Sequence, residues 1–395
     1  MPDILFSILQ ILGNIFNFLM PFILAFVLYK FGMMFWKHHK EQLFVSGMKW
    51  ALLEIRVPRD VDKSPKAMEF ILANALYQVT DKGFWETYIQ GTARFFSSLE
   101  IVSLGGQVHF YVRVPTRIRG LVESQIYAQY PQSEIVEVED YAMKVPDIEK
   151  DGAWKMWGCD FVLEKHDALP IKTYVDWEVE KLDEPESLDP LTSTIEYLGS
   201  IKPDEQIWIQ IIVRGTAKEY HTHGTMFGKH NFFDEVEEEI NRTTAPFSQH
   251  RKDDMTQEFV YEVRTPDPIK KRIEAMRNKQ SKLAFDVGIR AIYIAPSPAF
   301  SVDTYKGLRL MFRQYSNPQF NSLVRTNSTQ IESPWENNPW GTAVVKMKNH
   351  ALHNYRIRNY FYPTLRESIH WWWPLSAFFP NHPPHPFILN TEELA

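Results

Sequence analysis

The sequence predicts an α+β protein in which an N-terminal transmembrane helix precedes two α+β modules, the second with insertions. Three observations predict this class. An uncharged, predominantly apolar run occupies residues 4–29. Short β-rich segments then alternate with segments of helical spacing in the order β-α-β-β-α-β. A similar plan recurs, with longer intervening segments, between residues 146 and 325.

The apolar run at residues 4–29 is long enough to cross a bilayer. A helix over it reaches roughly 39 Å at ~1.5 Å per residue, against a hydrocarbon core of about 30 Å. Its most apolar part lies between Ile15 and Tyr29. The predicted anchor residues are Ile15, Phe16, Phe18, Leu19, Phe22, Ile23, Leu24, Phe26, Val27 and Leu28. A re-entrant or interfacial hairpin is the alternative.

The charges that flank the run predict its orientation. No Lys or Arg precedes it and no small-residue cleavage site follows it, so we expect a retained anchor and not a cleaved signal peptide. Lys30, Lys37 and Lys40 follow it, and positive residues favour the cytoplasmic side. We therefore expect a single-pass protein of the cell (inner) membrane, with the bulk of the chain in the cytoplasm and the lipid bilayer as a partner.

The remaining chain has the composition of a soluble protein. Its net charge of -6 is mild and the signs are interspersed, which argues against a polyanion-binding protein by bulk charge. The single cysteine, Cys159, excludes an intrachain disulfide and a multi-cysteine zinc site. The lack of an intrachain disulfide agrees with a reducing compartment.

The first module is predicted at residues 48–145, after an anchor and juxtamembrane segment at 1–47. In order, the patterns predict a strand at 49–57, a helix from 64 to 76, strands at 99–104 and 108–114, a helix from 118 to 130 and a strand at 134–138. Gly105 and Gly106 join the middle strands, and glycine supplies the positive φ that a tight hairpin needs. This is the split βαβ, or ferredoxin-like, order.

The second module is predicted at residues 146–325, as a ferredoxin-like unit with insertions. In order, the patterns predict short strands at 161–163 and 171–175, a helix from 189 to 198, a strand at 206–213, a basic helix from 268 to 283, a strand at 286–295 and an amphipathic helix from 302 to 315. Because both regions place a helix between strands and then a β-α step, we interpret them as a degenerate duplication.

The C-terminal part, residues 326–395, is predicted to hold a linker, a basic helix and a tail. Residues 326–339 are polar and rich in turn formers, and residues 351–361 follow a helical pattern. The tail at 371–387 carries five prolines, so it cannot form a regular helix. We expect it to pack as an extended strap along a neighbouring surface.

Three histidines lie close together in the segment at 215–230 (GTAKEYHTHGTMFGKH). Gly215 and, after five residues, His221 and His223 match the opening of a cupin metal motif, in which two imidazoles on one strand face bind a divalent metal. The carboxylate that the motif requires does not follow His223 at four or five residues. We therefore expect polar loop histidines, and keep a metal-dependent enzyme that uses His221, His223 and His230 as an alternative.

No complete nucleotide-binding or catalytic motif occurs in the sequence. Residues 224–229 (GTMFGK) end in Gly-Lys but have three residues between the glycines where a Walker A loop has four, and His230 stands where that loop needs Ser or Thr. No serine lies in a G-x-S-x-G elbow. We expect no catalytic residue, no cofactor, no small-molecule substrate and no enzymatic activity from this chain.

Basic and aromatic residues are interspersed in the C-terminal part. The predicted polyanion contacts are Lys346, Lys348, Arg356, Arg358 and Arg366. Arginine beside aromatic rings suits single-stranded nucleic acid, through backbone neutralisation and base stacking. The same charges suit anionic lipid, or only keep helices soluble. A nucleic-acid- or anionic-lipid-binding module is therefore a second alternative.

Several phrases of the sequence carry a family resemblance. They are LVESQIYAQYPQSEIVEVEDY at 121–141, DPLTSTIEYLGSIKPDEQIWIQIIVR at 189–214, SKLAFDVGIRAIYIAP at 281–296, MFRQYSNPQFNSL at 311–323 and PFILNTEELA at 386–395. Together they resemble the N-terminal, membrane-proximal region of HerA/FtsK-type ATPases related to type IV secretion and conjugation coupling proteins. In such proteins the last phrase lies just before the nucleotide-binding core, which this sequence lacks.

The resemblance implies either a truncated coupling-type ATPase or a free-standing relative that keeps the membrane and adaptor portion. Such a relative is expected to fall in a family described as a domain of unknown function. The leading hypothesis is a non-catalytic, membrane-anchored adaptor or scaffold that serves assembly or substrate presentation. Its expected partners are other membrane-complex proteins or an ATPase.

Overall fold

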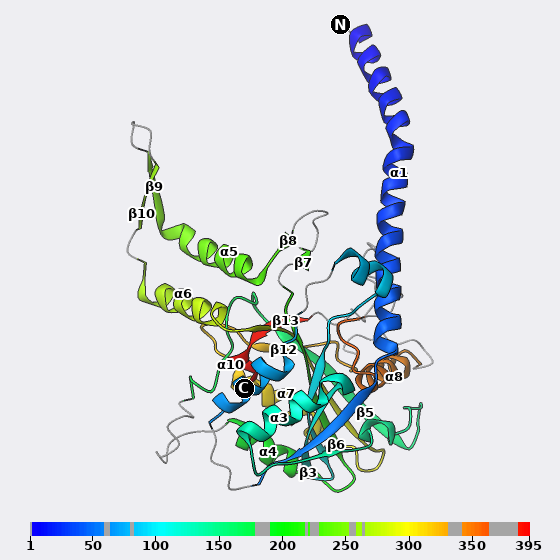
Figure 1. Cartoon of the computed structure of the whole chain (residues 1–395), viewed down its shortest axis with the longest axis vertical. Helices are drawn as coiled ribbons and strands as arrows, with labels where there is room; N and C mark the ends of the chain where they lie inside the picture. The colour runs from blue at the N-terminus through cyan, green and yellow to red at the C-terminus, as the bar shows by residue number, and fades with distance from the viewer. Residues whose placement is uncertain are drawn as a thin grey trace. The chain divides into compact units, whose positions relative to one another are not determined.

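The computed structural model contains two compact units (Figure 1). The structure describes residues 2–58, 64–79, 83–177, 190–217, 220–221, 229–252, 258–262, 265–330, 342–362 and 386–395. The first unit comprises Met1–Met48, Thr80–Ala93 and Tyr362–Ile369, and the second comprises Lys49–Val79, Arg94–Phe361 and His370–Ala395. We call the second unit the body.

The first unit is built on one long helix, α1 (Pro2–Ser46), which continues without a break through Pro21. It extends well past residue 29, where the predicted span ends. Its segment Gly13–Ser46 is long and apolar enough to cross a membrane, judged by length and composition. The predicted anchor residues lie on α1 with exposed side chains, except Val27, which is half-buried. A short helical segment ending in the π-helical turn η2 (Glu86–Gln90) belongs to the same unit.

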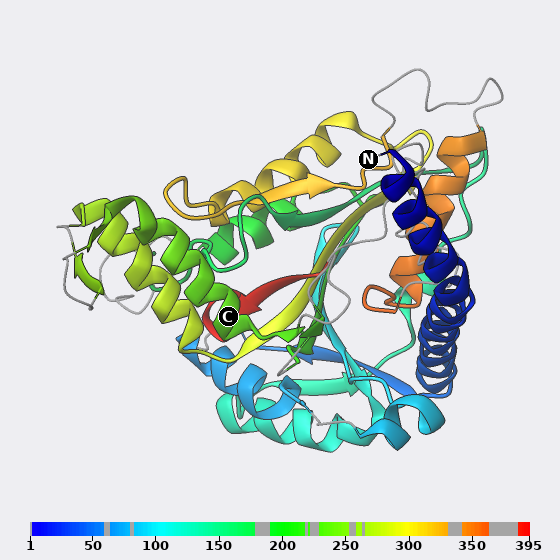
Figure 2. The ribbon, with the colours of Figure 1, turned by 90° about the horizontal axis from the view of Figure 1, so that it is seen from above.

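The body is an α+β structure around one antiparallel sheet with the strand order β12-β5-β11-β6-β2-β3-β1-β4, in which β13 also pairs with β11 (Figure 2). Its strands are β1 (Trp50–Arg56), β2 (Ser97–Leu104), β3 (Gln107–Pro115), β4 (Glu134–Glu137), β5 (Trp154–Leu163), β6 (Gln206–Gly215), β11 (Ala284–Pro296), β12 (Leu323–Thr326) and β13 (Phe387–Asn390). Two small ribbons pair β7 (Tyr220–His221) with β8 (Lys229–His230) and β9 (Ser248–Lys252) with β10 (Glu258–Glu262). The coarse prediction of an α+β class is confirmed.

Helices connect and cover the strands. The α-helices are α2 (Lys66–Ile71), α3 (Arg119–Gln129), α4 (Pro190–Gly199), α5 (Phe232–Thr244), α6 (Asp267–Gln280), α7 (Val302–Met311), α8 (Thr342–Arg356) and α10 (Thr391–Leu394). Shorter turns are η1 (Leu72–Leu76), η3 (Thr116–Ile118), η4 (Tyr141–Met143), η6 (Ala245–Phe247) and η7 (Phe312–Tyr315).

Alternating strand residues divide the core into two layers. On one face Leu53 and Ile209 pack in a cluster that includes Leu72, Val122 and Leu308 from the helical segments η1, α3 and α7. On the other face, Leu52 and Trp208 belong to a cluster with residues of η4 and α8, such as Tyr141 and Tyr355. The sheet is therefore buried on both sides by helices from different parts of the sequence.

The strand order of the body repeats. The first four strands lie in the order β4-β1-β3-β2, and β5, β6, β11 and β12 lie in the order β12-β5-β11-β6. In each half the order is therefore fourth, first, third, second. The two halves join where β2 pairs with β6, from Ser97 opposite Val213 to Leu104 opposite Gln206.

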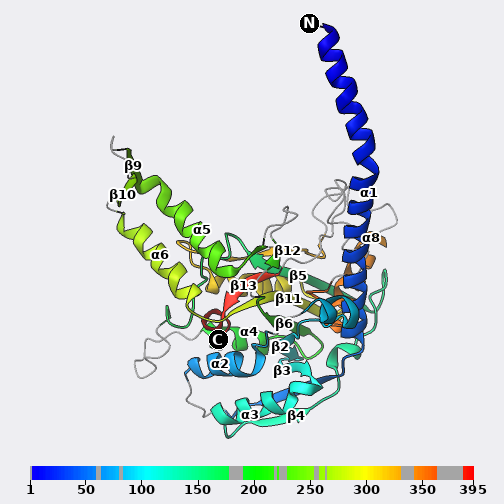
Figure 3. The same cartoon turned by 45° about the horizontal axis from the view of Figure 1, so that its top comes forward.

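An arm interrupts the connection from β6 to β11. Helices α5 and α6 pack against each other, and the β9–β10 ribbon lies at the far end of the pair, away from the sheet (Figures 1 and 3). We use "arm" for residues 232–280. At its base, Val236 of α5 and Met276 of α6 pack with Leu169 and Ile388. The arm therefore rests on both the loop after β5 and the C-terminal strand.

Several sequence-based element predictions were wrong. Residues 171–175 form no strand because their backbone amides bond elsewhere: Ile171 donates to the Glu393 carboxylate at 2.9 Å and Lys172 to the Tyr315 carbonyl at 3.0 Å. Strand β5 begins at Trp154, earlier than predicted, and α8 begins at Thr342. Strand β13 begins at Phe387, the last residue of the predicted irregular tail. Residues 371–385 of that tail and most of the linker lie outside the described residues.

Candidate functional site

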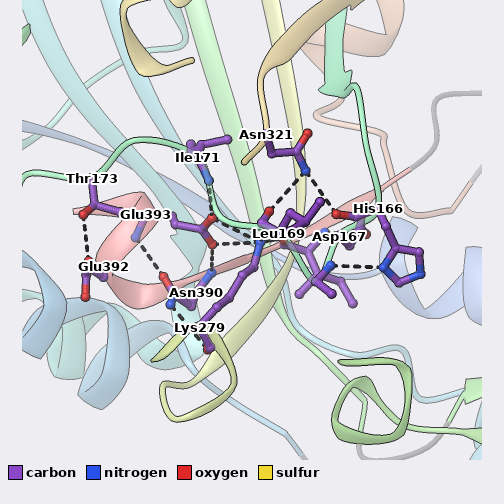
Figure 4. A network of polar contacts seen from close by, with 12 residues as sticks. His166, Asp167, Leu169, Ile171, Thr173, Lys279, Asn321, Asn390, Glu392 and Glu393 are labelled. Atoms are coloured by element: carbon purple, nitrogen blue, oxygen red, sulfur yellow. Dashed lines mark hydrogen bonds and ion pairs between the residues drawn. The ribbon is translucent and has the colours of Figure 1, made fainter. Parts of the chain in front are cut away.

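A buried polar network joins the base of the arm to the C-terminal segment (Figure 4). Lys279, in the last turn of α6, is fully enclosed together with the side chain of Glu393 in α10. Its Nζ lies 3.0 Å from Glu393 Oε2 and donates to the Ile388 carbonyl at 2.9 Å and the Leu169 carbonyl at 3.5 Å. The three donors of the ammonium group therefore have protein acceptors.

Glu393 occupies the third position of a capping box. Asn390 caps α10 by accepting from the Glu393 amide at 2.9 Å, and the Glu393 carboxylate accepts from the Asn390 amide at 2.8 Å. The sequence Asn-Thr-Glu-Glu supplies this pattern locally. Burial raises the pKa of Glu393, although Lys279 and two backbone amides act in the opposite direction. The carboxylate is therefore costly to bury and depends on these donors.

A second, partly exposed ion cluster surrounds this pair. Lys282 Nζ lies 3.0 Å from Glu69 of α2 and 2.6 Å from Glu392 of α10. Burial alone lowers the pKa of Lys282, but the hydrogen bonds to Glu392 and Glu69 outweigh it and raise that pKa. Thr173 donates to Glu392 at 2.7 Å, and Thr391 donates to Glu69 at 3.2 Å. Helix α2, the loop after β5 and α10 are thus tied together.

The loop after β5 completes the network. Asp167 accepts from the Ile388 amide at 2.9 Å, and burial raises the pKa of Asp167 to about 6. The buried side chain of Asn321 donates to the carbonyls of Lys165, His166 and Leu169. We call this whole set of contacts the C-terminal network. Its polar groups bind one another, an arrangement suited to holding a segment in place.

A separate buried ion cluster lies under α8. Arg358 is fully buried and donates to Glu100 at 2.9 and 3.0 Å and to Asp140 at 3.0 Å. Tyr141 donates to Glu100 at 2.8 Å. Burial alone raises the pKa of Glu100, but the Arg358 guanidinium outweighs it and holds that pKa below its usual value. These contacts hold the end of α8 on the sheet.

Comparison with protein families identifies what this architecture represents. The family model described as Domain of unknown function (DUF8128) matches residues 34–360. The chain belongs to the DUF8128 family. No curated protein matches this DUF8128 chain. The matched range covers the sheet up to β12 and helix α8, and ends before β13 and α10.

The predicted metal ligands of the DUF8128 chain lie around the small β7–β8 ribbon. His221 pairs with Lys229, and His230 pairs with Tyr220, in its antiparallel register. His223 lies outside the described residues. Among the residues that the structure describes, no group of three or more His, Cys, Asp or Glu side chains is arranged to hold a metal ion.

Of the predicted polyanion contacts, Lys346, Lys348 and Arg356 lie on α8. Burial and then Lys155 lower the pKa of Lys348. Arg356 pairs with Asp147 at 2.6 Å. Arg358 cannot contact an external polyanion, because its guanidinium is enclosed with Glu100 and Asp140. Arg366 lies outside the described residues.

The sequence indicated neither the C-terminal network nor the buried pairing of Arg358, which was predicted instead as a polyanion contact. Lys279 was one of several basic residues of a predicted basic helix, and Glu393 was part of a family phrase. The capping-box pattern Asn390-Thr-Glu-Glu was the one local signal for the C-terminal network. Nothing local predicts that Arg358 pairs with Glu100, because the two residues lie 258 positions apart in the sequence.

Proposed function

We propose that this protein is a non-catalytic, membrane-anchored adaptor or scaffold that serves assembly or substrate presentation in a secretion- or conjugation-type complex. The observation that carries the proposal is α1, whose exposed apolar side chains lead into an α+β body. Exposed Phe, Leu and Ile side chains in such number suit lipid and not water. The proposed orientation is single-pass, with the body in the cytoplasm, because Lys30, Lys37 and Lys40 follow the apolar run.

The resemblance to HerA/FtsK-type ATPases supports a coupling role for the C-terminal network. In those proteins the phrase that resembles ILNTEELA precedes the nucleotide-binding core. In this chain the same phrase forms β13 and α10, and Lys279 and Lys282 bind its carboxylates. We propose that the network fixes the position of this segment relative to the arm. A partner bound to the arm would then affect the C-terminal segment, and a partner bound to that segment would affect the arm.

We also propose that the body is a pair of ferredoxin-like modules joined edge to edge through β2 and β6. The repeated strand order of the two halves supports this interpretation. A helix follows the first strand and another follows the third strand in each half, as in the split βαβ order. The arm then corresponds to an insertion in the hairpin of the second module.

Membrane fractionation of cells that express the full chain tests the anchor. We expect the protein to stay in the membrane pellet after alkaline carbonate extraction, whereas a variant lacking residues 2–46 should enter the supernatant. Crosslinking of the full chain in native membranes, followed by purification, should recover a nucleotide-binding ATPase or other membrane-complex proteins. Quantitative release of the full chain by carbonate would contradict the anchored adaptor.

The same purified protein tests the two alternatives. A stoichiometric metal that is lost in His223→Ala would replace the adaptor with a metal-dependent enzyme. Binding of single-stranded nucleic acid or anionic vesicles that falls steeply with salt and with Lys346→Ala plus Lys348→Ala would favour a polyanion-binding module, because phosphate contacts release counterions.

A further inference from the structure

The short segment at residues 83–92 is held firmly against α1 within the first unit. The Trp36 indole donates to the Tyr88 carbonyl at 2.7 Å. Gly91 has φ 67°, and a Cβ at this position would lie 2.6 Å from the Lys40 backbone. Such an approach is open only to glycine. Residues 36 and 40 of α1 therefore fix the level at which this segment lies along the helix.

The segment is also internally well bonded. The Thr87 amide donates to the Gly83 carbonyl at 3.1 Å, and the Thr92 amide and hydroxyl donate to the Glu86 carbonyl at 2.9 and 3.0 Å. The Glu86 carboxylate accepts from the Gly83 amide. This bonding defines the backbone from which the apolar side chains of the segment project.

The outward side chains are large and apolar. Phe84 is 66% exposed and Trp85 is 64% exposed, and Ile89 and Trp36 are also exposed. The Phe84 and Tyr88 rings pack together at 4.8 Å between centroids. Lys40 lies over the Trp36 ring at 5.0 Å, so a cation borders the aromatic group. We call Trp36, Phe84, Trp85, Tyr88 and Ile89 the aromatic collar.

We propose that the aromatic collar inserts into the headgroup layer of the bilayer on the side where the apolar part of α1 ends. Aromatic rings with a polar edge favour this layer, as do lysines whose ammonium groups reach the lipid phosphates. The apolar residues of α1 continue past Tyr29 at Phe31, Met33 and Phe35, so Trp36 stands where the apolar part of the helix ends. The collar is thus continuous with the proposed span and follows its apolar end.

The inference rests on the proposed anchor, and spin labelling of the full chain can separate the two. Single cysteines replace Phe22 in α1, Phe84 and Trp85 in the collar, and Tyr127, an exposed residue of α3 in the body. The native Cys159 is buried and burial raises the pKa of its thiol well above the usual value, so the unsubstituted chain serves as the labelling background. All four positions are exposed, so folding should be retained.

Each labelled chain is placed in nanodiscs of phosphatidylcholine with phosphatidylglycerol, and its accessibility to oxygen and to a water-soluble nickel chelate is measured. We expect the labels at Phe84→Cys and Trp85→Cys to be several-fold less accessible to the chelate than the label at Tyr127→Cys, and shallower than the label at Phe22→Cys. If the labels at Phe84→Cys and Trp85→Cys are as accessible to the chelate as the label at Tyr127→Cys, the proposed position of the collar is wrong. The anchor is still supported in that case if the label at Phe22→Cys lies in lipid. A water-exposed Phe22→Cys overturns both.

Discussion

Lys279 and Glu393 stabilise the body only as a pair. Each alone would be an uncompensated charge in an enclosed site, because both side chains have no exposed surface. Breaking a buried ion pair by removing one partner costs roughly 3–5 kcal/mol, whereas replacing both by apolar groups is often close to neutral. The ion pair therefore acts mainly by specifying that α6 packs against α10.

Lys279→Met should destabilise the body by roughly 3–5 kcal/mol because it leaves the Glu393 carboxylate buried without its cation. Urea unfolding of the full chain in detergent, followed by tryptophan fluorescence, measures this change. Lys270→Met, on the exposed side of the same helix, should change stability by less than about 0.5 kcal/mol. Adding Glu393→Leu should recover only part of the loss, because it removes the unpaired carboxylate but also the acceptor for the Ile171 and Asn390 amides. A single variant Lys279→Met as stable as the wild type would show that the pair is unimportant.

Asp167 makes stability depend on pH. Its pKa of about 6 in the folded protein lies above the value of an unfolded chain, about 3.9. Between these values the folded protein holds a proton that the unfolded chain releases, so the free energy of unfolding falls as pH rises from 4 to 6. This contribution is fully present below pH 4 and is lost above pH 6.

Asp167→Asn keeps an acceptor for the Ile388 amide and cannot ionise. Relative to wild type, it should gain on the order of 2 kcal/mol in unfolding free energy between pH 4 and pH 7. Urea titrations at several pH values measure the difference. Asp204→Asn, in the exposed turn before β6, controls for the loss of one charge. Parallel pH profiles for Asp167→Asn and wild type would contradict the assignment.

At the scale of elements, the segment after α8 packs closely on the sheet because Gly288 has no side chain. Gly288 in β11 lies under the buried Tyr360 ring, and a Cβ on Gly288 would lie 2.4 Å from that ring. Arg290, two residues along the same strand face, lies 5.3 Å from the ring centroid. Strand and aromatic ring can approach this closely only because position 288 has no side chain.

Gly288→Ala should therefore destabilise the body by about 1–3 kcal/mol, since the ring or the strand must move. Gly120→Ala in α3 is the matched control, because no atom lies within 4 Å of a Cβ there. That substitution should stabilise the protein by about 0.5–1 kcal/mol, as alanine favours helices over glycine. Thermal unfolding should therefore show a lower melting temperature for Gly288→Ala and a higher one for Gly120→Ala than for wild type. Equal effects would rule out the steric explanation.

The sequence predicted elements with strong periodicity and missed those fixed by distant contacts. The hairpin at Gly105 and Gly106 was confirmed, with φ of 60° and 86°, because its turn chemistry is local. Strand β13 has only four residues and exists because β11 offers an unpaired edge from Ala284 to Val287. Residues 171–175 have β-rich composition, but the Ile171 amide donates to the Glu393 carboxylate and the Lys172 amide donates to the Tyr315 carbonyl. Neither outcome is encoded within the segment itself.

At the scale of the whole chain, each compact unit has its own organisation, and the body is continuous across its two halves. The β2–β6 pairing runs the full length of β2 and covers Gln206 to Val213 of β6. The core cluster on one face of the sheet includes residues from both halves. Nothing in the local sequence predicts this pairing, because β2 and β6 are separated by more than a hundred positions. The membrane-spanning potential of α1, by contrast, was evident from composition.

We expect the body to unfold as one cooperative unit. Ile209→Ala in the buried part of β6 should cost about 2–5 kcal/mol through lost packing. Native-state hydrogen exchange of the full chain should show the same loss of protection in β3 of the first half and β11 of the second. Ile357→Ala, which removes an exposed side chain, is the control. A loss confined to β11 would mean that the halves open independently.

Strand β13 also sets an order of events during synthesis. Residues Ala284 to Val287 pair with β6 on one side and with β13 on the other. A ribosome makes β13 after every other described strand of the sheet. Until Asn390 has been made, β11 keeps an open row of backbone groups that can attract another chain. The sheet of the nascent body therefore keeps this gap beside β11 until β13 emerges and fills it.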